Sequence, residues 1–229
     1  MQEALFGRGK GMKFFNKYFF IGFGCGVIFI FVCELLFALY AIMMVNRQMT
    51  SNLEKPELPL EIEADAPQAD YGFAVKDLQG NFKLVDTLKG KVIFLNIWAT
   101  WCPPCRAEMP SIQKVYDKMK NRKDVAFLIM TDEDLPTVQK FMKKNKYTFP
   151  VYLYKENSLP DVFRANAVPL TFIIAPDGKI AFKDSGAAKW DADEVFAFFD
   201  KLSSQGSVST TSHSFSTPTS LAPAKVKAN

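Results

Sequence analysis

Two cysteines near the middle of the chain have the spacing of a redox-active dithiol. The run WCPPC, residues 101–105, places two residues between Cys102 and Cys105. A pair so close in sequence encloses only a small loop, so a purely structural disulfide there would stabilise the fold little. A structural zinc site would need further cysteine or histidine ligands. The spacing therefore favours thiol–disulfide exchange as the chemistry of this pair.

The other metal-ligating side chains lie far from this pair in the sequence. Cys25 and Cys33 fall in an apolar N-terminal run, and His213, the single histidine, falls in a C-terminal tail. We therefore expect no metal site, and no cofactor beyond a redox-active Cys102–Cys105 disulfide. One histidine also argues against a Ser-His-Asp triad. The net charge of +4 shows no strongly basic face, which argues against nucleic acid as a partner.

The residues around the pair predict a strand before it and a helix after it. Residues 91–98 form a nearly unbroken apolar run, typical of a strand buried on both faces, and apolar residues recur with helical spacing over 108–120. Cys102 is therefore expected at the start of a helix, where free N–H groups and the helix dipole stabilise a thiolate. Pro103 and Pro104 lack N–H groups and fit the first helical turn.

This placement assigns different roles to the two cysteines. The first N–H available to the sulfur of Cys102 is that of Cys105, because both intervening residues are proline. We assign Cys102 as the nucleophile. Cys105, one turn into the helix and more buried, is the resolving thiol that attacks the mixed disulfide and releases the reduced partner.

Further periodic segments surround this unit. They comprise hairpins at 71–85 and 170–183, strands at 125–130 and 151–154, and helices at 135–146, 159–165 and 192–202. The order strand-helix-strand, then helix, then an antiparallel pair and a last helix predicts an α/β fold. Its central mixed sheet is covered by helices on both faces.

The N-terminal 45 residues predict a membrane anchor. Residues 1–17 carry four basic residues and one acidic residue, and residues 18–45 are almost entirely apolar. The apolar run is long enough to span a bilayer, too long for a secretory signal, and lacks a convincing cleavage site. The basic residues predict that the N-terminus stays in the cytoplasm. Glu34 is an unusual acid within the span, and its role stays open.

The rest of the chain is expected to form a spacer, a folded domain and a tail. Residues 46–69 contain prolines and acids and are expected to form an extended, water-exposed spacer. Residues 70–202 are expected to fold as one domain outside the cytoplasm. Residues 203–229 are rich in Ser and Thr, so we expect a disordered tail.

Several runs in residues 70–202 resemble the TlpA/ResA-like thioredoxins, which are membrane-anchored, extracytoplasmic thiol–disulfide oxidoreductases. The resemblance is carried by FLNIWATWCPPCRAEMP, DLQGNFKL, VPLTFIIAPDG and SGAAKW. It implies a thioredoxin fold with an N-terminal β-hairpin extension, preceded by one transmembrane helix.

The resemblance also implies roles for residues outside the dithiol. Val168-Pro169 matches a cis-proline beside the cysteines that shapes the substrate groove. Glu108 matches an acid that tunes the thiol pKa values or relays protons; the alternative is a solvent-facing acid favoured by the helix dipole. Trp101 either covers the edge of the site or serves simple packing, and the prolines between the cysteines would face the substrate.

One departure from the thioredoxin pattern bears on proton transfer. Thioredoxins have a buried Asp six residues before the first cysteine, where this chain has Asn96. An amide cannot carry a proton as a carboxyl group does, which makes Glu108 the better proton relay.

The resemblance implies an anchored reductase in an inner membrane with its catalytic domain in the periplasm or an equivalent space. Its substrates would be disulfide-containing extracytoplasmic proteins such as apocytochromes, and a transmembrane thiol carrier would supply electrons. The cysteine pair does not fix the direction of electron flow, so a disulfide-donating oxidase of the DsbA type is the alternative. A non-enzymatic copper metallochaperone is more remote, because such relatives use C-x-x-x-C and a distant His.

Overall fold

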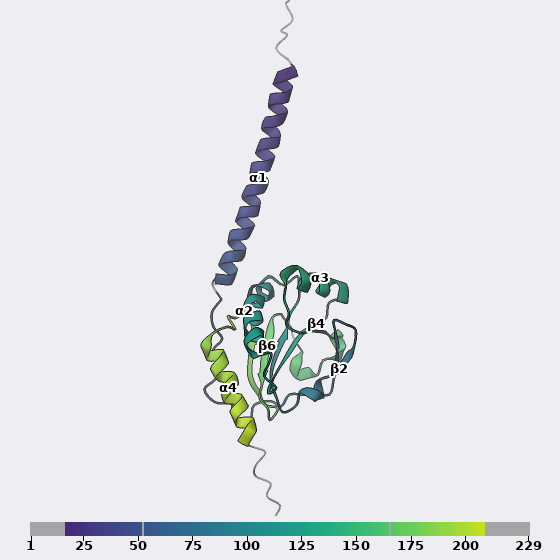
Figure 1. The fold of residues 1–229 in the computed structure, drawn as a ribbon, viewed down its shortest axis with the longest axis vertical. Coiled ribbons are helices and arrows are strands. Elements are labelled where there is room, and N and C mark those ends of the chain that lie inside the picture. The colour runs from purple at the N-terminus through teal and green to yellow at the C-terminus, as the bar shows by residue number, and fades with distance from the viewer. Residues whose placement is uncertain (1–16, 52, 165, 209–229) are drawn as a thin grey trace, which may run out of the picture. The chain divides into compact units, whose positions relative to one another are not determined.

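The computed structural model describes residues 17–51, 53–164 and 166–208 (Figure 1). The chain divides into an N-terminal unit that ends at Ser51 and a second unit that begins at Asn52. Most of the basic N-terminus and most of the predicted tail, His213 included, lie outside the described residues.

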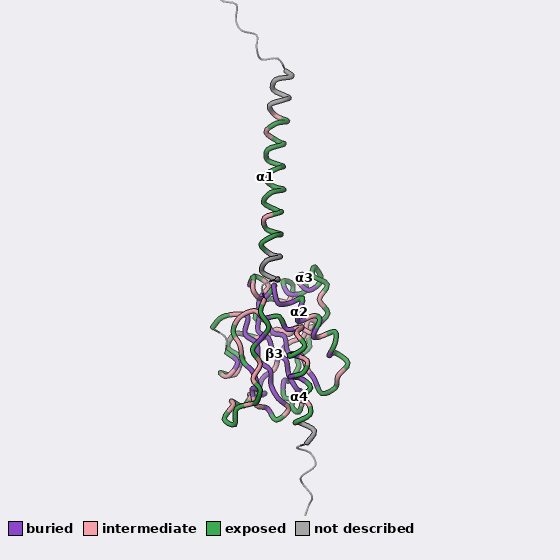
Figure 2. The backbone as a smooth tube through the Cα atoms, turned by 90° about the vertical axis from the view of Figure 1, so that its left-hand side faces the viewer, coloured by how far each residue is buried: buried purple, intermediate pink, exposed green. Residues whose placement is uncertain are grey.

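The N-terminal unit is a single helix, α1, over Lys17–Ser51. Its segment Gly24–Val45 is long and apolar enough to cross a membrane, judged by length and composition. Most residues described in this segment are exposed (Figure 2), as a surface that faces lipid would be. The helix continues through residue 51, so residues 46–51, expected in the spacer, belong to it.

The second unit is built on a seven-stranded mixed sheet with the strand order β2-β1-β5-β4-β3-β6-β7. Pairs β3–β4 and β4–β5 are parallel, and the other neighbours are antiparallel. The strands are β1 (Ala74–Asp77), β2 (Phe82–Leu84), β3 (Val92–Ile97), β4 (Val125–Thr131), β5 (Val151–Leu153), β6 (Leu170–Ile174) and β7 (Ile180–Ser185). The predicted thioredoxin-like sheet with an N-terminal hairpin, β1–β2, is confirmed.

The central strand β3 is buried along its whole length (Figure 2), which explains its unbroken apolar sequence. Its side chains alternate between two cores. Phe94 faces the core beneath the long helices, whereas Ile93 and Leu95 face the opposite core. Asn96 follows Phe94 by two residues, so it points to the helix-covered face of the sheet.

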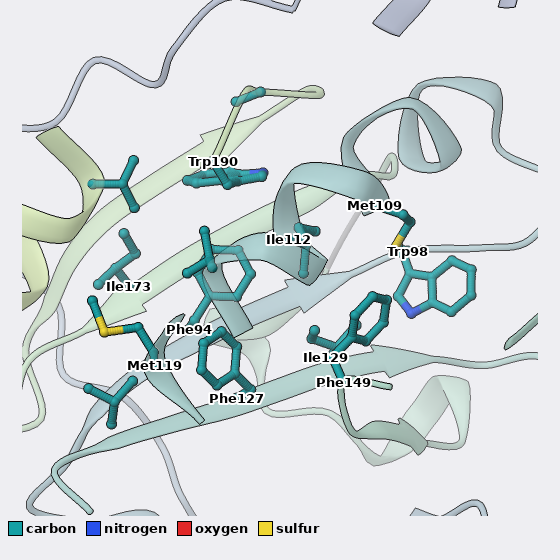
Figure 3. Close-up of a cluster of buried hydrophobic side chains, with 14 of the residues drawn as sticks. Phe94, Trp98, Met109, Ile112, Met119, Phe127, Ile129, Phe149, Ile173 and Trp190 are labelled. Atoms are coloured by element: carbon teal, nitrogen blue, oxygen red, sulfur yellow. The ribbon is translucent and has the colours of Figure 1, made fainter. Parts of the chain in front are cut away.

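Three helices contribute to the core on that face: α2 (Pro103–Met119), α3 (Leu135–Asn145) and α4 (Asp193–Val208). Figure 3 shows side chains of α2, among them Ile112, packed beside Phe94 and Trp190. The rings of Phe94 and Trp190 meet edge to face with centroids 5.1 Å apart. The packing of this core holds α2 against β3 and thereby sets the position of the first turn of α2.

The opposite core is covered by short segments instead of a long helix. The described residues include the 3-10 helices η1 (Val85–Leu88), η2 (Glu156–Ser158) and η3 (Asp161–Phe163). The spacing over 159–165 predicts a regular helix; the described part of that range instead forms a 3-10 turn after Pro160. Proline lacks the N–H that a continuing helix would need, so η2 and η3 stay separate turns.

Residues 53–69, which we term the strap, are part of the second unit; most of them are exposed, as expected of a spacer, but several of its apolar residues dock on the core, which was not expected. Pro56 is buried, and Leu58 and Ile62 pack on the core that holds Phe94. The apolar residues between the acids of this segment explain its docking, because burying them is favourable.

Backbone hydrogen bonds fasten the strap at both ends. The N–H of Lys189 donates to the carbonyl oxygen of Glu54 at 2.8 Å. The N–H of Ile180 donates to the carbonyl oxygen of Pro67, also at 2.8 Å. Lys55 also pairs with Glu194 of α4. The strap therefore contacts the segment that leads from β7 to α4.

Candidate active site

The cysteine pair lies where β3 ends and α2 begins. Cys102 is the N-cap of α2, with extended backbone angles, and it forms a disulfide with Cys105. The N–H of Cys105 donates to the sulfur of Cys102 at 3.2 Å. Both cysteines are buried, Cys105 completely. The helix N-terminus thus directs its first available donor at the Cys102 sulfur, as the two intervening prolines require.

The loop before β6 brings a second backbone segment to the disulfide. The Val168–Pro169 peptide bond is cis. The carbonyl oxygen of Val168 lies 3.6 Å from the sulfur of Cys102, although the two residues are 66 positions apart. The predicted groove residues Val168 and Pro169 are therefore adjacent to the predicted nucleophile.

A pocket of about 360 Å³ lies beside this contact. Its lining includes Trp101, Ala167 and Val168, which adjoin the disulfide or its contact in the chain, together with Asp132, Tyr154 and Arg164. Trp101 is 70% exposed, so it forms a wall of the site instead of packing in the core. The pocket lining thus combines apolar side chains with charged groups of both signs.

Glu108 is fully buried on the inner face of α2, which excludes the alternative of a solvent-facing acid. The side chain of Asn96 donates to its Oε1 at 3.0 Å, and the indole N–H of Trp190 donates to its Oε2 at 2.8 Å. The backbone N–H of Ala188 donates to Oε2 at 3.4 Å. Burial raises the pKa of Glu108 to about 7, and these hydrogen bonds oppose that rise only in part.

Two local patterns explain this burial. Glu108 lies three residues after Cys105 and next to Met109, so it falls on the face of α2 that packs on the sheet. Strand alternation turns Asn96 toward the same face. The carboxyl group therefore enters a polar pocket within an otherwise apolar core, where neutral donors satisfy it.

Sequence reasoning missed the donors of Glu108 that lie in the segment after β7. The run SGAAKW stands out only as a motif, with no role for Ala188 or Trp190. These residues are about 80 positions from Glu108, so no local pattern pairs them with it. The tryptophan itself was the available signal, because a buried indole N–H needs an acceptor.

A second missed residue is Glu133, which follows β4. Its carboxylate accepts from the backbone N–H of Thr100 at 2.5 Å and from the Thr100 hydroxyl at 2.6 Å. Thr100 lies two residues before Cys102, so this pair ties the loop that carries Trp101 to the end of β4. An acid in a loop after a buried strand gives no sequence signal for such a contact.

The comparisons with known proteins agree with this geometry. Residues 64–197 match the Redoxin family. The thiol-disulfide oxidoreductase ResA of Bacillus subtilis (strain 168) is 29% identical over 155 residues, covering 68% of this chain and 79% of that protein. A thiol-disulfide oxidoreductase ResA of Bacillus cereus is 35% identical over 127 residues, or 56% of this chain and 71% of that protein.

A solved structure extends the agreement to the fold. The thiol:disulfide interchange protein of the thioredoxin family from Chlorobium tepidum TLS is 26% identical. It superposes with a TM-score of 0.50 over 63% of this chain and 98% of that one. The sheet, the disulfide at the start of α2 and these similarities lead to one conclusion: this chain belongs to the Redoxin family and is a thiol–disulfide oxidoreductase of the ResA type.

Proposed function

We propose that this protein reduces disulfides of extracytoplasmic partner proteins, with α1 as its membrane anchor. The observation that carries the direction of electron flow is the buried carboxyl group of Glu108, one helical turn beyond Cys105. A dithiol becomes a strong oxidant when its reduced, thiolate form is stabilised. A nearby carboxylate and the Val168 carbonyl, 3.6 Å from the Cys102 sulfur, both disfavour negative charge there. The pair is therefore suited to giving electrons away.

The reaction is a pair of thiol–disulfide exchanges. The Cys102 thiolate attacks one sulfur of the partner's disulfide, forming a mixed disulfide and releasing the partner's other sulfur as a thiolate. The Cys105 thiolate then attacks the Cys102 sulfur, which closes the Cys102–Cys105 disulfide and releases the reduced partner. Two electrons pass to the partner, whose two sulfurs each take up a proton.

Glu108 serves this sequence as a proton carrier. Cys105 must lose its proton before it attacks, and it is fully buried, so bulk water does not take that proton directly. A carboxyl group with a pKa of about 7, on the same helix face, matches the need for a base near neutral pH. When the dithiol is regenerated, the same group returns the proton.

The partner is expected to bind along the loop before β6 and the start of α2. Trp101, Pro103 and Pro104 adjoin the cysteines in the chain, and the carbonyl oxygen of Val168, the residue before Pro169, lies 3.6 Å from the Cys102 sulfur. The adjacent pocket can receive a side chain of the partner, and the backbone of Val168 offers an edge for β-type pairing. Apocytochromes awaiting haem are the substrate class we propose.

The anchor sets where this chemistry takes place. The basic residues 1–17 favour a cytoplasmic N-terminus, and α1 is long enough to span the inner membrane. The catalytic unit then faces the periplasm or an equivalent space. A transmembrane thiol carrier would reduce the Cys102–Cys105 disulfide there, and anchoring raises the local concentration of the two proteins.

The reduction potential tests the direction of electron flow. Full-length protein in detergent is equilibrated with defined thiol–disulfide buffers, and the fraction of oxidised protein is measured. A potential near or below the roughly −270 mV of thioredoxin supports a reductase. A potential near the roughly −120 mV of DsbA overturns the proposal and identifies a disulfide donor.

A trapping experiment tests the roles of the cysteines and identifies the partners. Cys105→Ser should accumulate mixed disulfides through Cys102, because the resolving thiol is absent. Cys102→Ser is the control and should capture nothing. Capture by Cys102→Ser alone would reverse the two assignments, and the adducts of Cys105→Ser would show whether apocytochromes are among the partners.

A further inference from the structure

The side-chain amide of Asn96 lies at the centre of the polar pocket around Glu108. Its Nδ2 donates to Oε1 of Glu108 at 3.0 Å and to the hydroxyl oxygen of Thr171 at 2.8 Å. All three residues are fully buried. Asn96 and Thr171 are register partners on β3 and β6, so the sheet itself holds the amide beside the hydroxyl. Both hydrogens of Nδ2 are therefore used.

The oxygen of the Asn96 amide differs from its nitrogen in hydrogen bonding. Within the described part of the chain, Oδ1 of Asn96 is buried and has no hydrogen-bond partner. A buried acceptor without a donor is unfavourable, so such an atom calls for an explanation.

The contacts of Glu108 fit only one of its protonation states. Its oxygens receive hydrogen bonds from Asn96, Trp190 and the Ala188 backbone, and all three groups are donors. A carboxylate accepts from all of them. A protonated carboxyl group carries an O–H that needs an acceptor, and in this arrangement the O–H would face another donor.

Turning the amide over supplies the missing acceptor and moves the two Nδ2 hydrogens to the position where Oδ1 now lies. The two orientations of an asparagine amide have almost the same shape, and they exchange the positions of Oδ1 and Nδ2. Oδ1 would then accept from the O–H of Glu108 and from the hydroxyl of Thr171, because a hydroxyl can rotate from acceptor to donor. We propose that Asn96 is a positioning residue that serves both protonation states of Glu108 by turning its amide over.

This inference rests on the proposed role of Glu108 as proton carrier. Aspartate at position 96 would offer a second acid that competes for the same proton, whereas asparagine leaves Glu108 as the single proton-binding group of the pocket. Among the described residues, Asp184 of β7 also acts on the carboxyl at longer range and favours the protonated form, and the dithiol lies one turn earlier on the same helix. The Asn96 amide can form a hydrogen bond with Glu108 in both protonation states of the carboxyl group, which these groups do not do.

The reorientation of the Asn96 side-chain amide can be observed directly by NMR on full-length, isotope-labelled wild-type protein in detergent. The indole N–H resonance of Trp190 reports the protonation of Glu108, since the two are hydrogen-bonded. Above the midpoint of that titration, the Asn96 amide hydrogens should show a nuclear Overhauser effect to the Thr171 methyl group. Below the midpoint this effect should be lost, as Nδ2 turns away. An effect of equal strength at both ends of the titration would overturn the proposal.

Two substitutions add a test of the energetics. Asn96→Leu removes a donor from the carboxylate and an acceptor from the acid; the charge-assisted bond is the stronger, so the midpoint should rise by about one pH unit, or tenfold in proton affinity. Thr171→Val is the matched control. It removes the hydroxyl that contacts the Asn96 amide in both protonation states of Glu108. It should therefore lower the stability of the protein and leave the midpoint of the Trp190 titration unchanged. The inference is contradicted if the midpoint of the Trp190 titration shifts in Thr171→Val and keeps its wild-type value in Asn96→Leu.

Glu108→Gln separates this inference from the function on which it rests. If the Trp190 titration persists in that variant, Glu108 is not the titrating group and its role as proton carrier fails. If the titration disappears in Glu108→Gln but the Asn96–Thr171 effect is the same at both ends in wild type, only the inference about Asn96 fails.

Discussion

Glu108 shows how one residue can link stability to chemistry. Its carboxyl group is buried among neutral donors, so ionisation is less favourable than in water, and its pKa rises from 4.5 to about 7. An acid whose pKa is raised by folding binds more protons in the folded state. Its contribution to stability is therefore complete below pH 4.5 and is lost as the pH rises through about 7.

Replacing Glu108 by glutamine should remove this dependence on pH. The free energy of unfolding of wild type, relative to Glu108→Gln, should fall by about 3 kcal/mol between pH 4.5 and a pH above 7. Urea unfolding of both proteins at a series of pH values measures it. The slope should persist in high salt, because water and ions do not reach the carboxyl group. Parallel curves for the two proteins would contradict the prediction.

At the scale of elements, the first turn of α2 sets the environment of the nucleophile. Cys102 is the N-cap, and the prolines at 103 and 104 leave the N–H of Cys105 as the first donor to its sulfur. A helix N-terminus stabilises a thiolate through such donors, so withholding one makes the Cys102 thiolate less stable. The two prolines thus limit the oxidising strength of the disulfide.

Pro104→Ala should therefore raise the reduction potential. The new N–H at position 104 can donate to the Cys102 sulfur and stabilise the reduced form, by about 30 mV for a tenfold change in equilibrium constant. Pro110→Ala is the control, since Pro110 lies in the same helix but is exposed and outside the first turn. Titration in thiol buffers gives both values. A shift of equal size in both variants would refute the explanation.

Helix α3 ends in a conformation that its sequence does not favour. Its C-cap, Lys146, has φ of 59°, in the left-handed region. Glycine adopts this region without the steric cost that a Cβ atom brings. The end of α3 is therefore a place where stability can be gained.

Lys146→Gly should stabilise the protein by roughly 0.5–1 kcal/mol. Lys144→Gly, within the last turn of the same helix, is the control and should destabilise it by about 1 kcal/mol. Thermal or urea unfolding at equal pH measures both. Changes of the same sign in the two variants would show that the backbone conformation at Lys146 is not the cause.

At the scale of the whole molecule, the strap makes the catalytic unit larger than its sequence motifs suggest. Residues 53–69 add Pro56, Leu58 and Ile62 to the core face and pair with β7 and α4. Lys189, which bonds to the strap, lies between the two residues that donate to Glu108. The chain segment that follows α1 is therefore fastened next to the polar pocket.

A chain that begins at residue 70 should be less stable than one that begins at residue 53. The apolar side chains of the strap bury area worth about 2–4 kcal/mol, before the cost of ordering the segment is subtracted. Urea unfolding of the two shortened proteins measures the difference, with full-length protein in detergent as the reference. Equal unfolding midpoints would show that the strap contributes nothing to stability.

Much of the molecule was predictable from local sequence patterns. The apolar run of β3, the WCPPC motif and the helical spacing after it place the dithiol at a helix start, because each pattern depends on residues close in sequence. The hairpin β1–β2 and the apolar span of α1 follow from equally local signals. The same reasoning did not predict that α1 continues to residue 51 or that the strap docks on the core, since a Pro- and Glu-rich segment resembles a free spacer unless its few apolar residues find a surface.

Local sequence patterns predicted the thiol–disulfide chemistry, most of the element order and the assignment of Cys102 as nucleophile. The environment of these groups follows from the folded arrangement of the chain. Glu108 is buried because α2 packs on β3, and its partners come from positions 12 and 82 residues away. Hydrogen bonds over such separations depend on sheet register and on loop paths, which are global outcomes of packing. The pKa of Glu108 and the two possible settings of the Asn96 amide are therefore properties of the folded chain.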